Sequence, residues 1–287
     1  MERRACGWWL AGAVALAVAV GCEPAKELPT EVPKQAPPAD VWAAPTESDP
    51  TAKAHVEKVV KAFTAGKPDL LAKVKYSRAA LKGTMVISGE NPAVRAITGV
   101  WPDRYAVAND LQIADQKLLV RAWSNRTRFT AMNGDREQEN INRSETASVF
   151  VADGTGQHWM ALLQPLTDPK AVVYDLQSVT GTSPQTGLLH PVTLVKLALP
   201  DRPLFQLTFD SKTDTLLRVE YMIRESGVDR RKQWTALEHK PGPDGLILPT
   251  KTEVRHDGQL VERWTVEKWE FPATIPDTEF DPPTPKQ

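Results

Sequence analysis

The feature that most constrains the fold is an alternation of apolar and polar residues in the last third of the chain. The stretch "LFQLTFDSKTDTLLRVEYMI" holds two alternating runs separated by a polar turn. Successive side chains of a strand point to opposite faces, so each run predicts a β-strand with one apolar and one wet face. The residues expected on the shared apolar face are Phe205, Leu207, Phe209, Leu217, Val219, Tyr221 and Ile223. These two strands predict an antiparallel hairpin that buries one side.

Turn signals recur through most of the chain beyond Leu81. Asp257-Gly258 is a strong two-residue hairpin signal between alternating runs. The stretches "NGD" at 133–135 and "ADGTGQ" at 152–157 are interpreted as two further hairpin tips, because glycine next to a polar residue favours tight turns. The sequence therefore predicts a large antiparallel sheet, with strand following strand to the end of the chain.

An amphipathic helix is predicted before the first strand, in "DPTAKAHVEKVVKAFTAG". Asp49 can cap it, Pro50 suits the first helical position, and Gly66 can end it. A shorter helical piece is expected from about Pro68 to Val74. One apolar stripe runs at spacing i, i+3, i+4 and i+7 and consists of Val56, Val59, Val60 and Phe63. This stripe predicts a lid helix on the apolar face of the sheet, and hence an α+β fold.

The N-terminus resembles an export signal that ends at a cysteine. Arg3 and Arg4 precede an apolar stretch at 8–20, which is shorter than the roughly 20 residues that span a bilayer. The sequence "AVGC" resembles the lipobox of bacterial lipoproteins, in which the cysteine is lipidated and becomes the first mature residue. We therefore expect a signal peptide at 1–21 and lipidation of Cys22. An ordinary signal with an incidental cysteine is the alternative.

Cysteine usage and proline content support this organisation. The chain has two cysteines, and Cys6 would leave with the signal, so the mature protein would hold one thiol and no internal disulfide. The tract at 22–49 is rich in proline and poor in apolar residues, which predicts a disordered tether. Residues 50–287 are long enough to form one domain with its own core.

Composition and motifs argue against several classes of function. Lys plus Arg is 35 and Asp plus Glu is 36, and no basic stripe points to nucleic acid. No catalytic motif or metal-ligand spacing is found, so we expect neither an enzyme nor a metal or cofactor. The cationic group 230–232 is interpreted as a solvated turn or a contact for an anionic headgroup. The histidines are expected to be solvated or at strand ends, and they are His55, His158, His190, His239 and His256.

A family resemblance lies in the last third of the chain. The stretches "FDSKTDTLLRVEY", "GPDGLILPTKTEV", "HDGQLVERWTVEKWEF" and "IPDTEFDPP" follow one another. In this order they resemble the closing strands of the LolA/LolB and LppX-like lipoprotein carriers. The resemblance covers residues 205–283 clearly and residues 56–159 by pattern.

The resemblance implies an unclosed, curved antiparallel barrel with helices packed on its concave face. It also implies an apolar interior that holds acyl chains, which the seven residues of the predicted apolar face would line. We expect an exported lipoprotein anchored to a bacterial envelope membrane and facing the periplasm, and Glu23 after the cysteine favours the outer membrane.

Two main hypotheses and a remote third follow for the function. The first is an anchored protein that binds a lipid or lipoprotein acyl chain in an apolar cavity. The second is an envelope scaffold that binds a protein partner and whose interior is filled by its own side chains. A hydrolase is the remote third. The first two differ in whether the concave face encloses empty space.

Overall fold

The computed structural model describes residues 45–125, 128–138 and 143–282. The helices are α1 (Pro50–Phe63), α2 (Leu70–Lys73) and α3 (Arg143–Asp153), and the short helical turns are η1 (Gly154–Trp159, a π-helix), η2 (Gln164–Thr167), η3 (Pro243–Gly245) and η4 (Asp277–Phe280). The strands are β1 (Tyr76–Val86), β2 (Glu90–Val100), β3 (Arg104–Ile113), β4 (Gln116–Asn125), β5 (Arg128–Asn133), β6 (Arg136–Glu137), β7 (Val172–Thr182), β8 (Leu189–Ala198), β9 (Phe205–Asp210), β10 (Leu216–Glu225), β11 (Val228–Pro241), β12 (Ile247–His256) and β13 (Gln259–Glu270).

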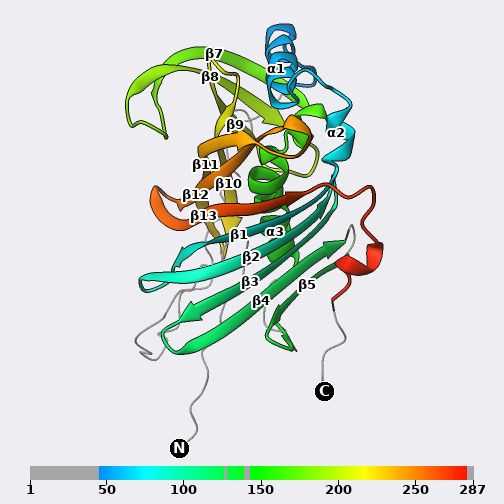
Figure 1. Cartoon of the computed structure of the whole chain (residues 1–287), viewed down its shortest axis with the longest axis vertical. Coiled ribbons are helices and arrows are strands. Elements are labelled where there is room, and N and C mark those ends of the chain that lie inside the picture. The colour runs from blue at the N-terminus through cyan, green and yellow to red at the C-terminus, as the bar shows by residue number, and fades with distance from the viewer. Residues whose placement is uncertain (1–44, 126–127, 139–142, 283–287) are drawn as a thin grey trace, which may run out of the picture.

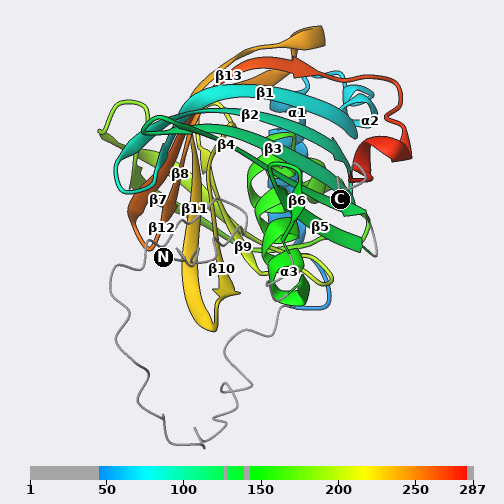
Figure 2. The same ribbon diagram turned by 90° about the horizontal axis from the view of Figure 1, so that it is seen from below.

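All these strands belong to one antiparallel sheet. In the described residues its order is β6-β5-β4-β3-β2-β1-β13-β12-β11-β10-β9-β8-β7. Strands that are neighbours in the sheet are therefore also neighbours in sequence, except in the middle of the sheet, where the first strand, β1, pairs with the last, β13. The sheet begins at β6 and ends at β7 and is not closed into a barrel. It curves strongly around the helices (Figures 1 and 2).

The unclosed, curved α+β half barrel expected from the sequence is therefore the fold of the protein. α3 lies on the concave side (Figure 2), where it contacts β4 and β5 on one arm of the sheet and β10 on the other. α1 packs at one end of the molecule, against β7 and β12. The helices thus fill the space between the two arms.

Local signals explain several element boundaries. The carboxylate of Asp49 accepts a hydrogen bond of 2.7 Å from the backbone N–H of Thr51, so it caps α1 as expected. Asp257 and Gly258 both have positive φ, 49° and 83°, which is typical of the tight hairpin turn between β12 and β13. The 133–135 hairpin joins β5 to β6. These three predictions are confirmed.

One expected hairpin is wrong. Residues 152–157 are helical and lie where α3 continues into the π-helix η1. Gly154 and Gly156, which were predicted to be turn residues, instead allow close packing of the helix against the sheet. A Cβ on Gly156 would lie 2.5 Å from Cε1 of Tyr221, and a Cβ on Gly154 would lie 2.8 Å from Cδ1 of Tyr105. The glycines therefore bring the helix backbone directly against two aromatic rings of the sheet.

Candidate functional site

The two strands predicted from the alternating pattern form a wall on the concave face. β9 and β10 pair so that Phe205 faces Tyr221 and Leu207 faces Val219. The exposed fractions of the seven predicted residues lie between 0% and 8%. A register shift between Leu216 and Arg218 changes the end of this wall. Leu216 therefore joins the core cluster, and Leu217 is buried outside it.

The lid helix covers this wall. Val56, Val59 and Phe63 belong to the same core cluster as the wall, and Val60 packs against its edge. The ring of His55 meets the ring of Phe209 edge-on at 5.4 Å between centroids. The sequence had predicted this face of α1, and the structure brings it together with the wall.

In the part of the chain that the structure describes, side chains fill the concave face around the wall, whose seven residues are at most 8% exposed. Two small spaces border it, one of about 10 Å³ beside Phe63 and Leu216, and one of about 30 Å³ beside His158 and Trp234. A single water needs roughly 10–15 Å³. These spaces therefore suit one or two waters, and an acyl chain would reach the wall only if α1 or α3 moved.

A wider space lies at the rim, between α1 and the segment 164–173. This rim groove has a volume of about 1210 Å³. Its residues are Thr46, Glu47, Ser48, Pro50, Lys53, Val56, Glu57, Val60, Lys61, Thr64, Gly66, Pro68, Leu166, Thr167, Asp168, Pro169, Lys170, Ala171, Val172 and Val173. The apolar members Val56, Leu166 and Val173 also belong to the core cluster. The groove therefore continues the apolar interior to the surface, with lysines along its edge.

A buried ion pair joins α3 to the sheet, and the sequence did not predict it. Lys232 on β11 has no exposed surface, and its Nζ lies 2.8 Å from Oδ2 of Asp153 at the end of α3. The hydroxyl of Tyr221 donates to Oδ1 of the same carboxylate at 2.6 Å. Tyr221 and Lys232 are cross-strand neighbours on β10 and β11, so one carboxylate ties the helix to two strands.

The surroundings of this pair are strongly perturbed. Burial raises the pKa of the Glu225 carboxyl, although Lys232 Nζ lies 3.7 Å away and lowers it. Burial and then the nearby Asp153 raise the pKa of Tyr221 well above its ordinary value. Burial also lowers the pKa of His256 to about 4. The interpretation of 230–232 as a solvated cationic group is therefore wrong for Lys232, whereas the side chains of Arg230 and Arg231 are 42% and 62% exposed.

A second buried network clamps the strands on either side of β1. Arg95 on β2 makes two hydrogen bonds of 2.8 Å to the carboxylate of Glu262 on β13, and its Nε donates to Asn109 at 2.6 Å. The guanidinium lies 4.3 Å from the ring of Trp264. Burial alone would raise the pKa of Glu262, but Arg95 outweighs it and the pKa is lowered. The guanidinium of Arg95 and the carboxylate of Glu262 are thus both hydrogen-bonded within the protein.

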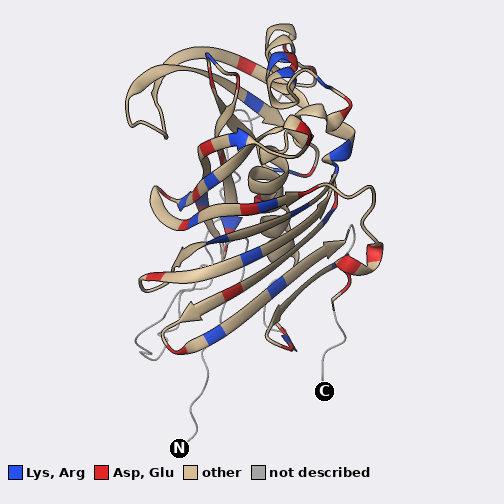
Figure 3. Cartoon of the chain, viewed as in Figure 1, with Lys and Arg blue, Asp and Glu red and all other residues tan. Residues whose placement is uncertain are grey.

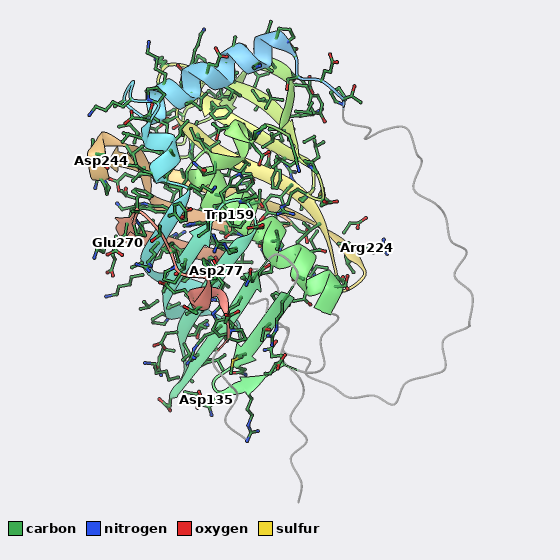
Figure 4. The ribbon with its side chains drawn as sticks, turned by 90° about the vertical axis from the view of Figure 1, so that its right-hand side faces the viewer. Asp135, Trp159, Arg224, Asp244, Glu270 and Asp277 are labelled. Atoms are coloured by element: carbon green, nitrogen blue, oxygen red, sulfur yellow. The ribbon has the colours of Figure 1, made fainter. Side chains whose placement is uncertain are left out.

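A histidine in the π-helix holds the helix to β1. Nε2 of His158 lies 2.8 Å from Oγ of Ser77, and its ring stacks on Trp269 at 5.5 Å. Burial lowers the pKa of His158 to about 3. A general base works best with a pKa near the operating pH, so this ring is poorly matched to that role. The next residue, Trp159, lies at the centre of the molecule (Figure 4) and has no exposed surface.

The expectation that the histidines are solvated or at strand ends is wrong for His55 and His158, which are buried in α1 and η1 with exposed fractions of 9% and 3%. His256 is the last residue of β12, as that expectation allows, and it is buried as well, with an exposed fraction of 7%. In the part of the chain that the structure describes, no three His, Cys, Asp or Glu side chains are grouped to hold a metal ion. No helix of the described ranges is long and apolar enough to span a bilayer. Charges of both signs are scattered over the strands (Figure 3).

Cys22 and most of the predicted tether lie outside the described residues. The last tether residues are described, and they belong to the folded domain. The backbone N–H of Asp49 donates to the carbonyl of Val173 at 2.9 Å, and Oγ of Ser48 accepts from the N–H of Val173 at 3.1 Å. Ser48 and Asp49, at the end of the predicted tether, are therefore hydrogen-bonded to β7.

Fold and site together define a class: an open antiparallel half barrel filled by helices, with an apolar wall and a groove at its rim. No protein-family model and no curated protein matches the sequence. Among solved structures, a putative outer membrane lipoprotein-sorting protein domain from Vibrio parahaemolyticus is similar, with a TM-score of 0.46 and 11% identity over 79% of this chain and 97% of that chain.

Two further solved structures are similar to this chain. A DUF1329 family protein from Desulfovibrio piger has a TM-score of 0.48 and 11% identity, and the match covers 82% of this chain and 98% of that chain. MucB has a TM-score of 0.27 and 12% identity over 83% of this chain and 64% of that chain. A lipoprotein-sorting domain is thus among the similar structures, and the fold assignment itself rests on the strand order.

Proposed function

We propose that this chain is a membrane-anchored envelope lipoprotein that binds an acyl chain of a lipid or lipoprotein. The rim groove is the observation that carries this proposal. Its volume of about 1210 Å³ exceeds the roughly 300–1,000 Å³ of typical small-molecule pockets. Its floor continues into the core through Val56, Leu166 and Val173. A flexible hydrocarbon chain suits such a surface, because it needs apolar area and no fixed polar partners.

The edge of the groove carries charges that a polar headgroup would meet. Lys53 and Lys61 stand two turns apart on α1, and Lys170 lies on the opposite side, and the same lining also holds the carboxylates Glu47, Glu57 and Asp168. A phosphate or carboxylate at the mouth would meet these ammonium groups, while the hydrocarbon lies along Val56 and Val60. The wall behind α1 would become a second apolar surface if α1 moved away from it.

The experiment measures binding of a fluorescent fatty acid to residues 45–287 purified without detergent. Val60→Glu places a carboxylate on the groove floor and should weaken binding about tenfold or more, since burying a valine contributes roughly 1.5–3 kcal/mol. Lys58→Glu is the matched control, because Lys58 is exposed on α1 outside the groove. If Val60→Glu and Lys58→Glu bound the fatty acid with equal affinity, the groove would not be the acyl-binding site.

The filled interior favours a second candidate, an envelope scaffold that binds a protein partner. Native mass spectrometry of the same detergent-free domain separates the two functions. Retained lipid supports acyl binding. A bare domain that also leaves the fluorescent fatty acid unprotected supports the scaffold.

A further inference from the structure

We propose that the tether folds back on the domain, with residues 39–44 seated in the rim groove and Trp42 on the groove floor. This docking does not require that the groove binds an acyl chain, although the segment and an acyl chain would occupy the same groove. It assigns a specific occupant to this surface, namely the segment of the chain that directly precedes the described residues.

The first argument is the place where the chain leaves the domain. Thr46, Glu47 and Ser48 are themselves part of the groove lining. The backbone N–H of Val173 donates to Oγ of Ser48, and the N–H of Asp49 donates to the carbonyl of Val173, which fixes this end against β7. The preceding residues therefore start from inside the groove.

The second argument is the shape of α1, which has three distinct faces. The core face holds Ala52, His55, Val59 and Phe63, which are buried. A second face lines the groove and carries Val60 between lysines, and Val56 lies at the border of the two. The third face, with Ala54 and Lys58, is exposed and lines no part of the groove. Val60 is partly exposed on the groove face, so this apolar side chain is accessible to a docked segment.

The third argument is reach and composition. Trp42 is the only aromatic residue at 23–49, and it stands within the apolar run 41–44. Trp42 is four positions before Thr46, a distance of at most about 13 Å when the chain is extended. Along α1, Val56 and Val60 lie about 9 and 15 Å from Pro50. Trp42 therefore reaches the apolar floor of the groove.

Disulfide formation tests the docking in the full chain with Cys6→Ser and Cys22→Ser, in cell extracts prepared without detergent. Ala39→Cys is combined with Lys61→Cys on the groove face or with Lys58→Cys on the free face. Oxidation is followed by mobility on non-reducing gels. Docking raises the effective concentration at the groove face, so the Lys61 pair should form about fivefold faster or more. Adding Trp42→Ala should remove this difference.

Equal rates for the two pairs, or a difference that persists in Trp42→Ala, would overturn the proposal. Neither result depends on lipid, so the failure of acyl binding leaves this test intact. A fluorescent fatty acid separates the two ideas further. If both hold, Trp42→Ala in the full chain binds it more tightly than the parent. If the disulfide pattern holds and no variant binds it, the docking stands and the acyl proposal falls.

Discussion

The charge of Lys232 is compensated inside the protein mainly by Asp153, at 2.8 Å, and also by Glu225, at 3.7 Å. Removing Lys232 alone, as in Lys232→Met, leaves the carboxylate of Asp153 buried without its cation, which should cost about 3–5 kcal/mol of unfolding free energy. The double variant Asp153→Asn with Lys232→Met should recover part of this loss, because the buried carboxylate of residue 153 is then gone. Urea denaturation measures both.

Arg230→Met is the control for this pair. Arg230 and Asp257 form an exposed pair at 3.0 Å, with side chains 42% and 47% exposed, so its loss should change stability by less than about 1 kcal/mol. If Lys232→Met were as stable as the parent, the buried pair would not hold α3 to the sheet.

His158 makes stability depend on pH in a defined direction. Its pKa is about 3 in the folded protein and roughly 6.5 in an unfolded chain, so the unfolded state binds one more proton between these values. The contribution of the neutral His158 ring to the free energy of unfolding is therefore complete above about pH 6.5. As the pH falls below this value, the contribution decreases by about 1.4 kcal/mol per pH unit. His158→Gln should reduce the pH slope of the parent by this amount, whereas the contributions of His239 and His256, whose pKa values burial lowers to about 4, remain in both proteins.

Urea unfolding at about pH 6, 5 and 4 measures the slope for the two proteins. Glu225, whose pKa is raised, acts in the opposite direction but is present in both. Ser77→Ala is the control, because it removes the hydroxyl partner and keeps the imidazole, so its slope should match the parent. An unchanged slope in His158→Gln would show that the ring is protonated in the folded state.

At the scale of elements, the packing of η1, which continues α3, depends on its glycines. Gly156→Ala places a Cβ where the ring of Tyr221 lies, 2.5 Å from its Cε1, and should cost about 1–3 kcal/mol by forcing helix and strand apart. Ser148→Ala, on the exposed side of α3, should be close to neutral. The midpoints of urea denaturation measure the two effects. If Gly156→Ala and Ser148→Ala had equal midpoints, the helix backbone at Gly156 would not pack directly against Tyr221.

The sequence predicted those elements that have one wet face. α1 and the β9–β10 pair each show an apolar stripe because their other side meets water. The region 153–162 has no such stripe, since Trp159, Met160 and Leu162 are all without exposed surface, and its glycines resemble turn residues. Hydrophobic periodicity disappears when an element is buried on all sides, so this central helix was missed.

The candidate site was predicted in part for the same reason. The wall and the lid helix follow from local patterns, and the structure brings them together. The ion pair of Asp153 and Lys232 joins residues 79 positions apart, so no local spacing signals it. The rim groove likewise arises only when α1 meets the segment 164–173.

At the scale of the whole molecule, the anchor remains a prediction. Cys22→Ala should leave an uncleaved or mislocalised precursor that no longer partitions into detergent, because lipid chains supply the membrane affinity of the mature chain. Membrane fractionation and the mass of the N-terminal peptide measure this. Cys6→Ala is the matched control, since that cysteine leaves with the predicted signal. Normal membrane recovery of Cys22→Ala would exclude lipidation as the anchor.

Because β1 pairs with β13, the sheet can be completed only after β13 has been synthesised. The first strand finds its second neighbour only when residues 259–270 have been made, so the centre of the sheet is absent from every shorter nascent chain. Contacts this distant in sequence form slowly. Until the last strand arrives, β1 has an unpaired edge and the apolar face lacks its middle. The newly made polypeptide therefore stays open to chaperones, proteases and transport machinery until synthesis is almost complete.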